Sequence, residues 1–102
     1  MNLKDITEKL IEADEKYAEK YTKYVPLEHA YQSRLNQLVL SSQRASQPLR
    51  EAEAMEAVRL EPIFEEYGNA VVEVKLANRR WETLKVVSAN IRNLAFLEGG
   101  EK

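Results

Sequence analysis

Apolar residues recur along this chain at the spacing that helix-on-helix packing requires. The first series, with steps of seven, is Leu3, Leu10, Tyr17, Tyr24, Tyr31, Leu38 and Ala45. The second, with alternating steps of four and three, is Ile63, Tyr67, Ala70, Val74, Ala77, Trp81, Leu84, Ser88, Ile91 and Ala95. An apolar period of about 3.5 residues keeps one face of a helix against a partner helix. The pattern therefore predicts an all-α chain of helices that pack on one another.

A companion series in the first half of the chain begins at Ile6 and Ala13 and then meets the charged Lys20. We expect Tyr21, one residue later, to take the apolar position, which is a local drift of the stripe. Pro26 lies in the same region and has no backbone N–H, so this helix should kink there.

Turn and capping residues predict where the helices begin and end. Asn2 can cap the first helix, and the polar segment 41–47 reads as a turn. Pro48 suits the first turn of a new helix, and Pro62 resets the apolar register. We expect a single domain over residues 1–102, with a helix at about 3–43, a turn at 44–47, a short helix at about 48–60 and a long helix at about 62–97. The alternative is one continuous helix from Pro48 to Leu97, kinked at Pro62.

The distribution of charge favours an antiparallel helical hairpin, or coiled coil, with a short connecting helix. From His29 to Arg50 the full charges are Arg34, Arg44 and Arg50 alone, and a run of glutamates follows. The bases of segment 75–92 would likewise face the acids of segment 5–19, so opposite charges meet at both ends. A hairpin this small leaves apolar residues such as Phe64 and Val87 outside the seam. We therefore expect a homodimer that completes a four-helix bundle.

Composition narrows the classes of function. The net charge of −2 argues against a general nucleic-acid clamp or a membrane-surface binder. The absence of cysteine excludes disulfides and thiolate metal sites and suits a cytoplasmic protein. His29 is the only histidine and has no further ligands in view, so we expect no metal and no cofactor. No nucleophile or acid–base set stands out, and we expect that the chain is not an enzyme.

Two groups of residues are candidates for binding. The first is the tyrosine series Tyr17, Tyr21, Tyr24 and Tyr31, which suits either a core or homodimer contact or a stripe that binds another protein. The second is a basic set around Trp81, formed by Lys75, Arg79, Arg80, Lys85 and Arg92. Basic side chains beside an aromatic ring can hold phosphate while a base stacks on the ring. Because Trp81 lies on the apolar stripe, we favour a core role for it and expect weak or indirect contact with nucleic acid.

Three segments carry a resemblance to known proteins. They are the opening Leu3-Lys-Asp-Ile-Thr-Glu-Lys-Leu10 with residues 13–17, the central Arg50-Glu-Ala-Glu-Ala-Met55 and the closing segment 81–94. The chain resembles short helical-hairpin proteins of bacteriophages and prophages, often encoded near genes for recombination and single-strand DNA binding. The resemblance implies a non-enzymatic accessory protein of DNA recombination or replication, in the host cytoplasm, that acts through protein–protein binding. A small inhibitor or adaptor that binds a host protein, such as a defence protein, without contacting DNA is the open alternative.

Overall fold

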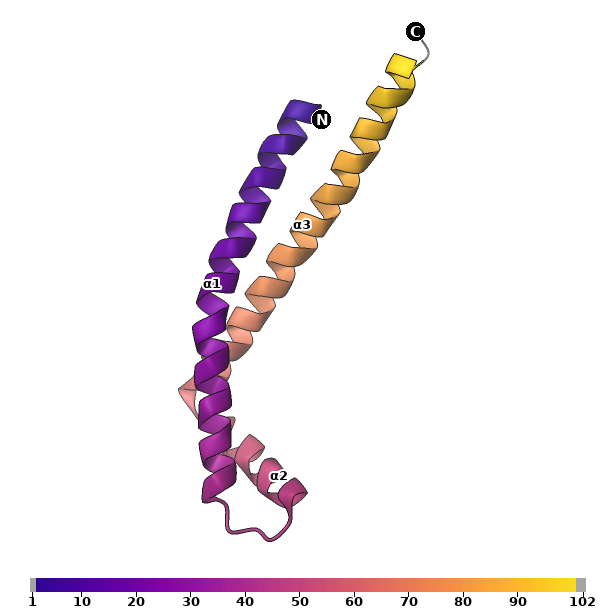
Figure 1. Cartoon of the computed structure of the whole chain (residues 1–102). Coiled ribbons are helices and arrows are strands. Elements are labelled where there is room, and N and C mark those ends of the chain that lie inside the picture. Colours follow the sequence, from indigo (N-terminus) through magenta and orange to yellow (C-terminus); the bar gives the residue numbers. More distant parts are fainter. Residues whose placement is uncertain (1, 101–102) are drawn as a thin grey trace.

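The chain folds into three helices, seen in a computed structural model that describes residues 2–100 and the side chains of residues 2–97. They are α1 (Leu3–Ser41), α2 (Gln47–Val58) and α3 (Pro62–Gly100), and the described residues include no strand. Figure 1 shows α1 and α3 side by side, with α2 against the end of α1 that is remote from the N-terminus. The prediction of an all-α chain with helices packed on one another is therefore confirmed.

The first helix begins and ends through local hydrogen bonds. The Asn2 side chain accepts a hydrogen bond of 2.9 Å from the backbone N–H of Asp5, which satisfies one of the free donors of the first turn. At the other end Ser42 takes an extended backbone (φ −70°, ψ 140°) and donates its N–H to the carbonyl of Val39. The helix therefore ends at Ser41, two residues before the expected boundary.

A tight turn separates α2 from α3. Ser46 caps α2 by accepting a hydrogen bond from the N–H of Leu49, and Pro48 lies in its first turn. After Val58 the N–H groups of Leu60 and Glu61 bond to carbonyls three residues earlier, which tightens the backbone. The chain then begins a new helix at Pro62 in a different direction (Figure 1). The alternative of one continuous kinked helix is therefore wrong, while α3 extends three residues beyond its expected end.

The apolar seam between α1 and α3 follows the expected stripe on α3. Ala70 and Ser88 are buried, and Tyr67, Trp81 and the other members as far as Ile91 are half-buried. Ala95 is exposed because α3 continues past the start of α1, as Figure 1 shows. The seam therefore ends about one turn before the sequence pattern does.

On α1 the expected drift from Lys20 to Tyr21 is wrong. The Lys20 side chain is only 22% exposed and lies on the seam, whereas Tyr21 is 48% exposed. Lysine can occupy this position because its alkyl stem packs on apolar neighbours while its ammonium group reaches Glu73 on α3, at 3.4 Å. The sevenfold spacing of Ile6, Ala13 and Lys20 is thus kept across the charged residue.

Pro26 lies inside α1 without ending it. Its missing N–H leaves one backbone carbonyl of the preceding turn without its helical partner. Figure 1 shows that α1 bends along its length while it stays continuous. Pro26 is therefore accommodated within a continuous helix.

The molecule is long and thin. It measures 75 × 23 × 15 Å, and its radius of gyration of 21.6 Å far exceeds the roughly 13 Å of a compact chain of this length. Only a few side chains are fully enclosed, among them Ile6 and Val58. Within the described residues, none of the helices is both long and apolar enough to cross a membrane.

Candidate functional site

The four candidate tyrosines join a row of aromatic rings that crosses from α1 to α3. Ring centroids are 6.1 Å apart for Tyr17–Tyr21 and 5.9 Å apart for Tyr21–Tyr24. Tyr67 of α3 then lies between two of them, at 5.8 Å from Tyr24 and 4.5 Å from Tyr31. The Tyr31 and Tyr67 rings are nearly parallel, with an interplanar angle of 4°. This row is the largest aromatic cluster among the described residues and joins the two long helices.

The members of the row differ in their access to solvent. Tyr31 is buried and directs its hydroxyl to the Met55 sulfur of α2, at 3.7 Å, so it is a point where all three helices meet. Tyr17 and Tyr24 are half-buried, whereas Tyr21 keeps 48% of its surface exposed. Tyr31 therefore serves the core, and Tyr21 is the member that a partner reaches most easily.

Within the row, the surroundings of Tyr24 change the pKa of its hydroxyl group. Hydrogen bonding to the Tyr67 hydroxyl, together with partial burial and the nearby Glu28, raises the pKa of Tyr24 above its ordinary value. The Tyr24 phenol therefore stays neutral throughout the physiological range. It contributes an apolar ring and a hydrogen-bonding hydroxyl to this surface and no charge.

A shallow groove follows the exposed side of the tyrosine row. It has a volume of about 380 Å³ and is lined by Tyr21, Tyr24, Glu28, Val71, Val74 and Lys75. The lining is mainly apolar, with one acid from α1 and one base from α3. Such a surface suits contact with another protein.

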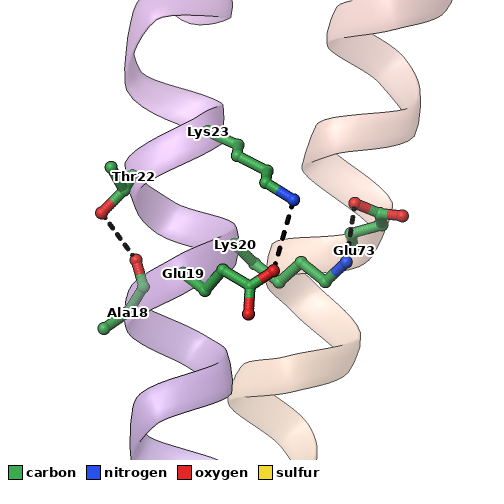
Figure 2. Close-up of polar contacts among 6 residues, drawn as sticks. All are labelled: Ala18, Glu19, Lys20, Thr22, Lys23 and Glu73. Atoms are coloured by element: carbon green, nitrogen blue, oxygen red, sulfur yellow. Dashed lines mark hydrogen bonds and ion pairs between the residues drawn. The ribbon is translucent and has the colours of Figure 1, made fainter.

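A second groove lies on the opposite side of the hairpin and has a different character. It has a volume of about 390 Å³ and is lined by Glu12, Ala13, Lys16, Lys20, Glu73, Leu76, Ala77 and Arg80. Figure 2 shows the interhelix pair of Lys20 with Glu73, and the Lys23–Glu19 pair within α1. The mixed charges here largely compensate one another, so this groove offers no concentrated field to a ligand.

The basic candidates do not form one surface. Lys75 and Arg79 are four residues apart and share one side of α3, whereas Arg80 borders the second groove, beside Lys20 and Glu73. Trp81 is half-buried on the seam, and the Lys85 ammonium lies over its ring at 4.0 Å from the centroid. The structure thus brings Lys85 to Trp81, but it does not gather the five bases on one side of α3.

The expected pairing of α3 bases with α1 acids does not occur among the described ion pairs. Lys85 bonds within its own helix, to Glu82 at 3.3 Å, and the interhelix pair at this end, Lys20–Glu73, has the reverse polarity. Near the turn the expectation is confirmed, because Arg34 pairs with Glu61 at 2.7 Å and Arg44 with Glu53 at 2.9 Å. The difference arises because the bases of α3 mostly point away from the seam.

The sequence interpretation did not assign Tyr67 or Phe64 to the site. Tyr67 belongs to the predicted α3 stripe, and Phe64 lies 6.5 Å from Tyr31 between ring centroids. Antiparallel pairing places the first turns of α3 beside the second half of α1. Pairing Arg34 with the glutamates near residue 61 would have set the register between the two helices, and this register places both rings beside Tyr31.

No group of three or more metal-ligating side chains gathers anywhere among residues 2–97. His29 is exposed on α1. Comparison with known proteins shows no matching family, no similar curated protein and no similar solved structure. The functional argument therefore rests on the surface of the chain itself.

Proposed function

We propose that this chain is a non-enzymatic binding protein that works as a homodimer, in which two hairpins form a four-helix bundle. The observation that carries this proposal is the large surface area that the chain exposes. The chain exposes 7799 Å², whereas a compact monomer of this mass exposes about 5,900 Å². Exposed apolar side chains such as Ile11, Tyr21 and Leu76 contribute to the excess. A second copy would cover part of this surface and thicken a core that is now only two helices deep.

Light scattering coupled to size exclusion tests the homodimer. At about 50 µM, well above the dissociation constant of a specific dimer, the molar mass should be twice the 11.8 kDa of the chain. A mass near 11.8 kDa at this concentration would contradict the proposal.

We further propose that the protein acts as a phage-type accessory factor in DNA recombination or replication, through a protein partner in the host cytoplasm. The resemblance carried by segments 3–10, 50–55 and 81–94 supports this role. The test is affinity purification of the tagged chain from phage-infected bacteria. Recovery of an annealing or single-strand-binding protein after nuclease treatment would support it, and its absence would count against it.

The second candidate is an inhibitor or adaptor that binds a host protein without contacting DNA. The placement of Trp81 favours this alternative, because a ring half-buried on the seam beneath Lys85 is poorly placed to stack on a base. Recovery of a host defence enzyme in the same purification, with loss of its activity on addition of the pure chain, would select this role.

A further inference from the structure

The first helix carries a second apolar row beside the seam that it shares with α3. The row consists of Ile11, Ala18, Tyr21 and Val25, whose steps of seven, three and four match the period of a second helix contact. Ile11 is 54% exposed, Tyr21 is 48% exposed, Ala18 is exposed and Val25 is half-buried. A helix with two heptad rows on adjoining faces is built to contact two neighbours, and α3 supplies only one of them.

The start of α3 extends this apolar surface. Val71 borders the same groove as Tyr21, and Phe64 lies one heptad before Val71 with 38% of its surface exposed. We call this surface the tyrosine face and define it by Ile11, Ala18, Tyr21, Val25, Phe64 and Val71. It runs across both long helices, so an occupant would contact the hairpin as a whole.

We propose that the tyrosine face is the surface on which the second copy of the chain docks. This inference rests on the proposed homodimer and names its interface. The exposed area exceeds that of a compact monomer by about 1,900 Å². A standard interface buries about 800 Å² of each partner, so one docked copy can remove a large part of the excess.

Charge on the tyrosine face indicates how the copies lie. On this side α1 contributes the acids Asp14 and Glu28, and α3 contributes the bases Lys75 and Arg92 with one acid, Glu82, which pairs with Lys85 of its own helix. If α1 packed antiparallel on the α1 of the other copy about Tyr21, Asp14 would oppose the partner's Glu28. Packing α1 on the partner's α3 instead brings acid to base. The copies therefore lie with α1 of each against α3 of the other, which makes every neighbouring helix pair antiparallel.

The opposite side of the hairpin is less suited to a second copy. Leu76 is 58% exposed there, but its groove is lined by Glu12, Lys16, Arg80 and other charged side chains. An interface on this side would have to remove several charges from water. The groove on the tyrosine face is lined by only two charged side chains, Glu28 and Lys75, beside two rings and two valines.

Two matched substitutions test the assignment. Ile11→Glu places a charge on the tyrosine face, and Leu76→Glu places the same charge on the opposite side at a residue of similar exposure. Sedimentation equilibrium should show a dissociation constant raised at least about tenfold by Ile11→Glu and changed less than about threefold by Leu76→Glu. Ala18→Glu repeats the test at a small exposed residue, and circular dichroism checks that each variant keeps its helices.

The outcomes separate the interface from the homodimer. A wild-type chain that is monomeric at about 50 µM overturns both proposals. A wild-type dimer that Leu76→Glu dissociates, while Ile11→Glu and Ala18→Glu leave it intact, overturns only the tyrosine face as its interface. Dissociation by Ile11→Glu and Ala18→Glu, with Leu76→Glu still dimeric, supports the assignment.

Discussion

Arg34 and Glu61 form the ion pair that joins α1 to the turn before α3. The Arg34 Nε–H donates to a Glu61 carboxylate oxygen at 2.7 Å, and the Glu61 side chain is 28% exposed. The hydrogen bond and charge of Arg34 hold the pKa of Glu61 below its ordinary value, against a smaller opposing effect of burial. The pair therefore stabilises the fold only while Glu61 is ionised.

This pair gives folding stability a defined dependence on pH. Because the pKa of Glu61 is lowered in the folded chain, its contribution is complete above the unfolded value of 4.5 and is lost as pH falls below it. We expect Glu61→Gln to reduce stability near neutral pH and to flatten the loss of stability on acidification. Urea unfolding at about pH 7 and about pH 3 measures both effects.

Glu65→Gln, an exposed change in the first turn of α3, is the control and should keep the acid sensitivity of the wild type. An unchanged acid response in Glu61→Gln would contradict the role of the ion pair.

Trp81 is the residue at which the core and binding interpretations give opposite predictions. It is half-buried on the seam, so Trp81→Ala should cost about 2–3 kcal/mol, somewhat less than for a fully enclosed tryptophan. Trp81→Phe, which keeps an aromatic ring for contact with α1, should cost less than half as much. Thermal unfolding of the two variants measures this. An unchanged melting temperature for Trp81→Ala, together with lost DNA binding, would instead assign the ring to base stacking.

Within α3, Gly68 is a local weakness of a long helix. A Cβ atom added there would meet nothing within 4 Å. Alanine should therefore be accepted without a clash, while it restricts the unfolded chain and favours helix. We expect Gly68→Ala to raise the free energy of unfolding by about 0.5–1 kcal/mol. Chemical denaturation measures the gain.

Ala89→Gly is the reciprocal control for Gly68→Ala. Ala89 lies three heptads later on the same exposed side of α3, so this change should lower stability by a similar amount. A loss of stability in Gly68→Ala would show that this position needs the close approach of another chain, as in a tightly packed dimer.

At the scale of the whole molecule, charge and shape together bear on nucleic acid. The net charge is −2, and the bases of α3 spread around the helix. Binding to a single strand would depend on a few phosphate contacts and would weaken steeply as salt rises. We therefore expect little or no binding by the chain alone near physiological salt. Fluorescence anisotropy with labelled single-stranded DNA at low and moderate salt measures it.

Submicromolar affinity that survives moderate salt would contradict this expectation. The double variant Arg79→Glu, Arg80→Glu locates any such binding, since both residues are exposed and adjacent on α3. Loss of affinity in this variant would assign DNA binding to the basic set. The double variant Lys4→Glu, Lys9→Glu, at two exposed residues near the start of α1, controls for the change in total charge.

Local patterns in the sequence determined the elements of this protein. The heptad series, the cap at Asn2 and the positions of Pro48 and Pro62 were enough to predict three helices with boundaries close to those observed. These features act through backbone hydrogen bonds and side-chain periodicity, which depend on residues only a few positions apart. The same patterns identified the tyrosines as a group, because their spacing places them along one side of α1.

Only the tertiary structure decided which side chains lie on the seam between α1 and α3 and which remain exposed. It placed Lys20 on the seam and left Tyr21 exposed, because Glu73 of α3 lies where the Lys20 ammonium can reach it. It also stopped the seam before Ala95, because α3 continues past the start of α1. Both outcomes depend on the register between helices far apart in the sequence. A periodic pattern shows that a helix has a contact face, but the partner and its register decide which residues that contact covers.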